Sequence, residues 1–301
     1  VSLEAVRRGK DVYCEKPISY TIREGRVLSD AVARYGAVLQ VGSQQRSDRR
    51  FRFGCELVRN GVLGKLRRIE VGMPGGKTTG THPPMPVPDG FDYDRWLGPA
   101  PRAPYTKARC HYNFRFISDY SGGQMLNWGA HHLDIAQWGH GTDRSGPVEV
   151  QGKAVYPRDG LFDNPVTYDC TYRYADGVEL HCGTTLRNGV RFIGSEGWVY
   201  VNRGRIEAEP AELLRAVIPP DGIHLYESRS HKADFLNCVR TRREPVAPAE
   251  VGHRSASMGH IGNIAMKLGR RLRWDPERET FPDDVDACRW LERPMRSPWC
   301  L

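Results

Sequence analysis

The short apolar segment Val12-Tyr13-Cys14 has the composition of a buried strand and runs directly into Glu15-Lys16-Pro17. The residue before a proline is pushed out of the α-helical region into extended conformation. In open α/β sheets, ligands bind in the crevice at the carboxyl ends of the strands. We therefore predict that Lys16 follows a strand and points into such a crevice. A lysine exposed to solvent at a turn is the alternative that this motif alone leaves open.

A second motif begins with paired glycines and continues into a segment with helical spacing. Residues 122–139 read GGQMLNWGAHHLDIAQWG. Asn127, His131 and Asp134 stand at i, i+4 and i+7, so a helix places all three on one face. This polar stripe in an apolar helix is more typical of a site than of a core. The alternative is a core helix with one hydrogen-bonded histidine and one solvated histidine.

Together the two motifs resemble the glucose-fructose oxidoreductase, inositol dehydrogenase and rhizopine catabolism (Gfo/Idh/MocA) family of nicotinamide-dependent sugar oxidoreductases, over nearly the whole chain. In that family E-K-P ends a strand of the nucleotide-binding domain, and G-G-x(n)-D-x-G-x-H-x-x-D supplies the catalytic histidine. Asn127 replaces the acidic residue of the second motif but can still hydrogen-bond a hydroxyl. The matching residues are Glu15, Lys16, Pro17, Gly122, Gly123, Gly129, His131 and Asp134, with further similarity at 42–46, 94–101, 231–236 and 290–294.

The resemblance implies hydride transfer between the nicotinamide of NAD or NADP and a hydroxyl-bearing carbon of a sugar or polyol. It implies His131 as acid/base, since an imidazole titrates near neutral pH. Lys16 would stabilise negative charge on the substrate oxygen or share its proton. Candidate substrate-binding residues are Asn127, Asp134, Arg46, Tyr112, Asn113 and Arg115, and candidate cofactor-binding residues are Glu15, Lys16, Pro17 and Gln44. For Tyr112, packing in an aromatic core is an equal alternative.

Two other functions remain open. A glycoside hydrolase that uses NAD for transient oxidation and elimination would share Lys16 and His131, but the sequence identifies no base for the α-proton. A non-catalytic sugar-binding or scaffold relative is the second alternative. The presence of both Lys16 and His131 argues against it, and Asn127 argues for it. The sugar, the choice between NAD and NADP and the reaction direction are not encoded in any motif that we identify.

The expected fold class combines α/β with α+β. Residues 1–42 alternate helix and strand, with a helix over 21–35 capped by Thr21 and ended by Gly36. We assign this part to the remainder of a Rossmann-like doubly wound domain. No G-x-G-x-x-G is present, so we expect a chain truncated at its N-terminus that lacks the first βαβ units and does not hold a dinucleotide, or turn over, as given.

Residues 43–301 are predicted to form the substrate-binding and oligomerisation domain. Alternating apolar patterns separated by turns predict a mainly antiparallel open sheet. The predicted strands are 66–73, 148–156, 166–174, 178–185, 190–193 and 198–202, and the predicted helices are 50–60, 230–241 and 249–268. A long loop is expected at 74–104, and the C-terminal tail is expected to cross back over the body. The resemblance implies helices on one face of the sheet and a homo-oligomer contact on the other.

Composition excludes some classes of function. The net charge is +8, but Lys and Arg are scattered rather than clustered in one tract, so no nucleic-acid partner is predicted. No apolar stretch approaches the roughly 20 residues of a membrane span. Eight cysteines without C-x-x-C predict free thiols, and adjacent His131 and His132 diverge on a helix, so no metal site is predicted. We expect a cytoplasmic protein, with export to the periplasm as the alternative.

Overall fold

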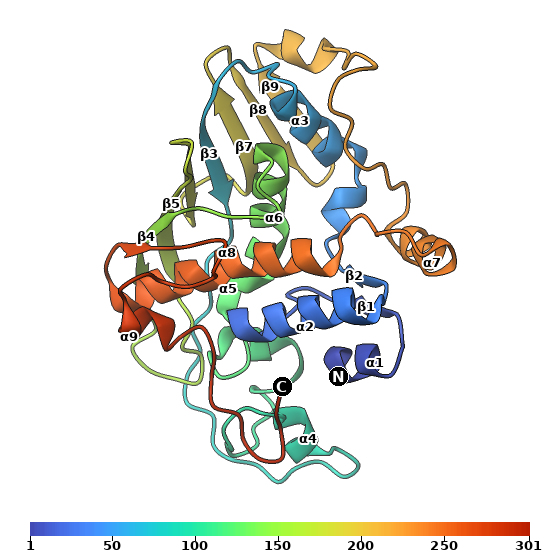
Figure 1. Cartoon of the computed structure of the whole chain (residues 1–301). Coiled ribbons are helices and arrows are strands. Elements are labelled where there is room, and N and C mark those ends of the chain that lie inside the picture. Colours follow the sequence, from blue (N-terminus) through green and yellow to red (C-terminus); the bar gives the residue numbers. More distant parts are fainter.

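A computed structural model describes residues 1–301 and places the strands in two sheets, a small parallel one and a large mixed one (Figure 1). The small sheet belongs to the N-terminal part of the chain. Its elements are α1 (Ser2–Arg7), β1 (Val12–Cys14), α2 (Ile22–Tyr35) and β2 (Leu39–Val41). Strands β1 and β2 pair in parallel, with Val12 opposite Leu39. Their carboxyl ends therefore lie at the same edge of the sheet.

Helix α2 has the boundaries that its terminal residues dictate. The Thr21 side chain accepts a hydrogen bond from the backbone N–H of Glu24, which satisfies one donor of the first turn. Gly36 ends the helix in the left-handed conformation, with φ of 60°, which costs a glycine little. Ile22 and Leu28 are buried on its inner face. The helix predicted over 21–35 is confirmed.

The large sheet has eight strands, and all neighbouring pairs are antiparallel except β3 and β6. The mainly antiparallel sheet is thus confirmed, while the parallel pair and the strands β9 and β10 were not predicted. In spatial order the strands are β10 (Leu272–Arg273), β4 (Glu149–Val155), β5 (Thr167–Arg173), β6 (Glu179–Gly183), β3 (Leu66–Gly72), β7 (Gly189–Gly194), β8 (Trp198–Asn202) and β9 (Arg205–Glu209).

Helices cover one face of this sheet, as Figure 1 shows for α3, α6 and α8. Every second residue of β5 is buried toward the helices, namely Tyr168, Cys170 and Tyr172. The Tyr172 hydroxyl donates to the Met258 carbonyl of α8 at 2.9 Å. The remaining elements are η1 (Gln44–Ser47), α3 (Arg49–Arg59), α4 (Tyr93–Leu97), η2 (His111–Phe116), α5 (Gly123–Asn127), α6 (Gly129–His140), η3 (Ala211–Arg215), α7 (His231–Thr241), α8 (Ala249–Leu268) and α9 (Val285–Cys288).

Helix α8 belongs to both hydrophobic cores. Ala256 packs in the small core with α2 and β2, whereas Ile264 packs in the large core beneath the sheet. Gly252 allows the helix to approach β2 closely, because a Cβ there would lie 2.4 Å from a Val41 methyl carbon. This shared helix fixes the β1–β2 edge relative to α6, which is the relation that the candidate site needs.

The long connection at 74–104 contains only the short helix α4 (Figure 1). The C-terminal tail returns to it: the Arg296 guanidinium donates to the Asp94 carboxylate at 2.8 Å and to the Gly98 carbonyl at 2.9 Å. The Arg293 guanidinium of the same tail lies 3.6 Å from the centroid of the Tyr20 ring. Tyr20 stands four residues after Lys16 in the sequence. The tail therefore ties the long loop to the segment that follows β1.

Candidate functional site

Lys16 joins the two parts of the molecule. Glu15 and Lys16 follow β1 directly, at the edge where β2 also ends, and the backbone N–H of Gly42 donates to the Cys14 carbonyl at 2.8 Å. The Lys16 ammonium group donates to the backbone carbonyl and to the side-chain oxygen of Asn127, both at 2.8 Å. The two motifs found in the sequence, whose contacting residues stand 111 positions apart, therefore meet in space.

The predicted continuous helix is interrupted at Trp128, between α5 and α6. In an unbroken α-helix the Asn127 carbonyl would accept from the His131 N–H. Instead the His131 N–H donates to the Trp128 carbonyl at 3.0 Å, and the Asn127 carbonyl accepts from the lysine. A charge-assisted bond to an ammonium group is stronger than the amide bond it replaces. The predicted helical segment is therefore present as two helices, and the Asn127 carbonyl at their junction accepts from Lys16.

His131 is buried, with 6% of its surface exposed, and its Nδ1 has no hydrogen-bond partner. Burial, together with the positive charges of Lys16 and Arg203, lowers the pKa of His131 to about 2. Burial also lowers the pKa of Lys16 to about 8, with Arg115 as the next contribution. The site therefore holds a neutral imidazole with a free nitrogen beside a lysine that loses its proton easily.

Arg46 and Asp134 form a buried ion pair one helical turn beyond His131. The guanidinium donates to both Asp134 oxygens at 2.8 to 3.0 Å and to Asp143 at 3.1 Å, and it stacks 4.8 Å from the Trp138 ring centroid. Ser255 donates to the same Asp134 carboxylate at 2.7 Å. Burial opposes the charged form, yet the two carboxylates raise the pKa of Arg46. Both predicted substrate-binding groups are fully engaged with the protein.

Tyr112, Asn113 and Arg115 lie together on η2. Tyr112 is 60% exposed, so core packing does not explain it. The Arg115 guanidinium lies 3.6 Å from the centroid of the Tyr112 ring, and its Nε donates to the Tyr112 carbonyl at 2.8 Å. The charge of Arg115 acts on the Lys16 ammonium group. The structure thus places this predicted segment on the same side of the molecule as the lysine.

The predicted cofactor contacts lie at the exposed edge of β1 and β2. The Gln44 amide donates to the Glu15 carboxylate at 3.3 Å, and both side chains are exposed. Pro17 is partly buried beside them. A Cβ at Gly42 would lie 2.6 Å from a Glu15 oxygen, so a side chain there would displace the Glu15 carboxylate. The exposed Glu15 and Gln44 thus lie at the edge from which Lys16 projects.

Sequence reasoning missed Arg203, in the turn between β8 and β9. Its guanidinium lies 4.8 Å from the Trp128 ring centroid, and its charge lowers the pKa of Lys16, His131 and His132. The turn Asn202-Arg203-Gly204 gave no signal, because the strand after it was not recognised. His132 was also not assigned; its Nε2 lies 3.2 Å from the Asn188 side-chain oxygen, away from the lysine.

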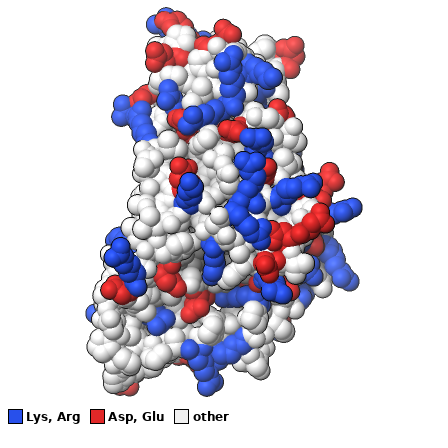
Figure 2. All heavy atoms as spheres, turned by 90° about the vertical axis from the view of Figure 1, so that its left-hand side faces the viewer, with Lys and Arg blue, Asp and Glu red and all other residues white.

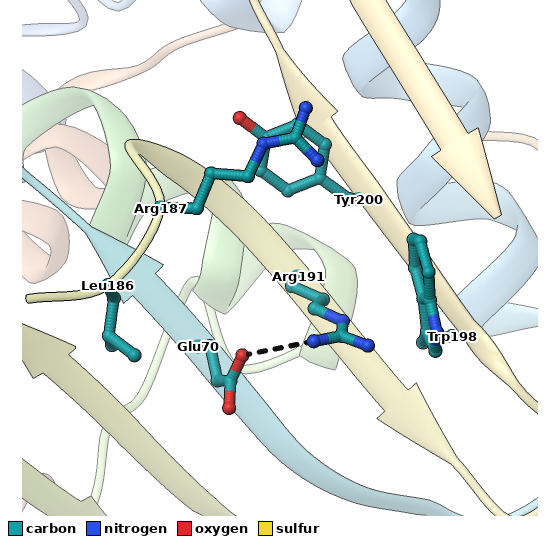
Figure 3. A pocket seen from close by; sticks show the side chains of 6 residues that line it. All are labelled: Glu70, Leu186, Arg187, Arg191, Trp198 and Tyr200. Carbon is teal, nitrogen blue, oxygen red and sulfur yellow. Dashed lines mark ion pairs between the residues drawn. The ribbon is translucent and has the colours of Figure 1, made fainter. Parts of the chain in front are cut away.

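The open face of the sheet carries a separate pocket of about 190 Å³. Figure 3 shows Arg187 stacked on Tyr200 and Arg191 beside Trp198, with ring-centroid distances of 3.9 and 4.2 Å. Arg191 also pairs with Glu70 at 3.7 Å. Acidic and basic side chains are interspersed over the side of the molecule in Figure 2.

No group of three His, Cys, Asp or Glu side chains is close enough to hold a metal ion, and all eight cysteines are free thiols. No helix combines the length and the apolar character needed to cross a bilayer.

The chain is similar to known oxidoreductases in sequence and in fold. Residues 56–301 match the family described as oxidoreductase family, C-terminal alpha/beta domain. The scyllo-inositol 2-dehydrogenase (NAD(+)) of Bacillus subtilis is 24% identical over 293 residues, which are 92% of this chain and 74% of that protein.

Two solved structures share the fold. The aldose-aldose oxidoreductase of Caulobacter crescentus, complexed with glycerol, has a TM-score of 0.63 at 20% identity, over 90% of this chain and 74% of its own. The WlbA dehydrogenase of Bordetella pertussis, in complex with NADH and UDP-GlcNAcA, has a TM-score of 0.64 at 17% identity, over 91% of this chain and 74% of its own.

Proposed function

The chain belongs to the Gfo/Idh/MocA oxidoreductase family, and we propose that it catalyses hydride transfer between a nicotinamide dinucleotide and a carbon that bears a hydroxyl of a sugar or polyol. The observation that carries the proposal is the contact between Lys16 and Asn127. This contact brings a lysine from the β1 edge beside a buried histidine with a free nitrogen, and these are the groups that alcohol oxidation needs.

The residues at the β1–β2 edge fit the nicotinamide end of such a cofactor. Glu15, Lys16 and Gln44 lie at the carboxyl ends of two parallel strands, where nucleotides bind in open α/β sheets. Gly42 keeps the backbone of this edge free of a side chain. The cofactor, when bound, supplies the hydride acceptor or donor. NAD agrees with the name of the inositol dehydrogenase relative, and NADP stays open.

His131 is the proposed base. In the oxidative direction the C–H bond breaks with its electron pair going to the nicotinamide, the hydroxyl O–H bond breaks, and its proton moves to the imidazole. Its Nδ1 has no hydrogen-bond partner, so a ring nitrogen is available to the proton. The products are a ketone or aldehyde, the reduced nicotinamide and one proton.

Lys16 is proposed to hold the reacting oxygen. An ammonium group has three N–H donors, and two of them go to Asn127, so one remains for the substrate oxygen. The Asn127 amide nitrogen donates to Gln124 at 3.0 Å, so its oxygen faces the lysine. We therefore propose that Asn127 orients the lysine, a role that an amide oxygen performs without a carboxylate.

Arg46 and Asp134 are proposed to position α6 rather than to bind sugar. Their hydrogen-bonding groups are occupied by each other, by Asp143 and by Ser255. Tyr112, Asn113 and Arg115 stay as proposed substrate contacts, since η2 presents exposed groups near the lysine.

A panel of inositols, hexoses and pentoses tests the function in the full-length protein, with NAD or NADP and with reduced cofactor as the readout. We expect stoichiometric cofactor reduction by at least one sugar and loss of about 10²-fold or more in Lys16→Ala. An NAD-dependent glycosidase would instead release sugar from a glycoside without net reduction. Absence of cofactor binding would favour the sugar-binding or scaffold alternative.

We also propose that the open sheet face joins copies of this chain into a homo-oligomer. The support is a sheet face that α3, α6 and α8 do not cover and that carries the partly exposed Trp198 beside Arg191 and Glu70 (Figure 3). Aromatic and arginine side chains are enriched in protein interfaces. Trp198→Glu should lower the molecular mass measured by light scattering, whereas Trp290→Glu, at an exposed tail position, should not. A monomeric wild-type protein would contradict the proposal.

A further inference from the structure

Three cationic side chains besides Lys16 surround the candidate site without a carboxylate partner. Arg203 lies over Trp128, and Arg115 and Lys77 lie near Tyr112 at 3.6 and 6.0 Å from the ring centroid. No Asp or Glu oxygen comes within 4.0 Å of the charged nitrogens of these three side chains. Glu15 is the only carboxylate whose charge acts appreciably on Lys16. The site therefore carries an excess of positive charge.

Three arginines packed against the core helices elsewhere are paired with carboxylates. Arg46 binds two carboxylates, Arg26 pairs with Glu250 and Glu279, and Arg254 pairs with Glu250. Arg203 and Arg115 instead rest on aromatic rings, which orient a guanidinium; Arg115 uses its Nε for the Tyr112 carbonyl, and its two terminal NH₂ groups have no protein partner. Free guanidinium donors in fixed orientation are suited to bidentate binding of a carboxylate or a phosphate.

We infer that the sugar substrate carries an anionic group, a carboxylate or a phosphate, and that Arg203 and Arg115 bind this group beside the Lys16–His131 pair. The inference rests on the proposed function and adds the class of substrate. The two arginines come from the β8–β9 turn and from η2, so the anion would be held between the large sheet and the segment that follows the long loop. Both residues are specificity determinants and neither touches the transferred hydride.

The charge balance gives such an anion a second effect. In the free site the charges of Lys16 and Arg203 add to burial in lowering the pKa of His131. A bound carboxylate or phosphate would offset these charges but not the burial, so the pKa of His131 would rise and the imidazole would become a stronger base. A neutral sugar leaves the suppression in place. Anionic substrates should therefore show a higher kcat as well as a lower KM than neutral sugars.

The test compares glucose, glucuronate and glucose 6-phosphate in the full-length protein with bound cofactor. We expect at least one anionic probe to exceed glucose in kcat/KM by about tenfold or more, and the carboxylate and phosphate arms identify which anion is preferred. Arg203→Gln should remove most of this preference and leave glucose within about threefold, while Arg203→Lys should retain part of it. Arg115→Gln should lower kcat/KM for the anionic probes more than for glucose.

Arg34→Gln is the matched control, because Arg34 is an exposed, unpaired arginine 6.0 Å from the Tyr35 ring centroid on α2. Equal kcat/KM for glucose and both anions would overturn the inference. So would an Arg203→Gln variant whose only defect is weaker cofactor binding. If none of the probes is oxidised, the proposed function fails for them, and calorimetric binding to the cofactor-bound protein decides the inference instead: salt-sensitive binding of an anion, weakened in Arg203→Gln, supports it, and no such binding overturns it.

Discussion

Helix α6 carries two buried polar clusters that differ in how completely they are satisfied. Asp134 accepts from Arg46 and Ser255, and Arg46 also binds Asp143. His131, three residues earlier on the same helix, leaves Nδ1 without a partner. A buried polar atom without a partner costs roughly 1 to 3 kcal/mol, so it persists where something else compensates. We propose that the saturated Arg46–Asp134 cluster is structural and that the site lies at His131, where a nitrogen without a partner lies near Lys16.

His131→Ala should produce the largest effect on activity. Removing the base is expected to lower kcat by about 10² to 10⁴-fold. The free energy of unfolding should change by less than about 2 kcal/mol, because the lost ring nitrogen made no hydrogen bond. Steady-state kinetics and urea unfolding of the same preparation measure both. Wild-type turnover in a folded variant would remove His131 from the mechanism.

Arg46→Met should give the opposite pattern. The substitution leaves Asp134 buried without its cation, which is expected to cost about 3 to 5 kcal/mol in the free energy of unfolding. Turnover per folded molecule should fall much less than in His131→Ala. The double variant Arg46→Met, Asp134→Leu should recover part of the stability, since the unpaired charge is gone. A single variant that unfolds like wild type but loses turnover would assign Arg46 to the substrate site.

Lys16→Met tests whether Lys16 is desolvated at the site, through the pH dependence of the free energy of unfolding. The pKa of Lys16 is lowered to about 8 in the folded protein, against an ordinary value of 10.5, so the unfolded chain binds more protons between these values. Folded-state stability of the wild type therefore rises as pH increases from 8 to 10.5, relative to the variant. Since Lys16 is partly solvated, we expect a change of about 1 kcal/mol, read from urea unfolding at pH 7 and pH 10. A pH-independent difference would mean that the lysine is not desolvated.

Local signals predicted the elements that local chemistry determines. Thr21 and Gly36 specify the ends of α2, and in β3 the buried Ile69 and Val71 flank the less buried Glu70 as a strand should. The parallel pairing of β3 with β6 depends on contacts across more than 100 residues, such as Ile69 opposite Leu180, which no local pattern encodes.

The sequence likewise predicted only part of the candidate site. The sequence identified Lys16 and His131 through their motifs, but not the break at Trp128, because a lysine from another part of the chain competes for the Asn127 carbonyl. Arg203 was missed because β9, Arg205–Glu209, is short and charged, with only Ile206 and Ala208 partly buried. Without that strand, the preceding turn could not be placed beside α6.

Gly42→Ala should give the smallest effect and shows how tolerant the open edge of the site is. The new Cβ would meet the Glu15 carboxylate at 2.6 Å, and an exposed glutamate can move away at little cost. That movement breaks the contact between Gln44 and Glu15, so the KM for cofactor should rise by about two- to fivefold with stability nearly unchanged. Gly36→Ala is the contrasting control, because it strains a left-handed helix end and should lower stability by about 1 kcal/mol without changing the cofactor KM. A stability loss in Gly42→Ala equal to that of Gly36→Ala, with an unchanged cofactor KM, would mean that this edge is part of the rigid scaffold and that the cofactor binds elsewhere.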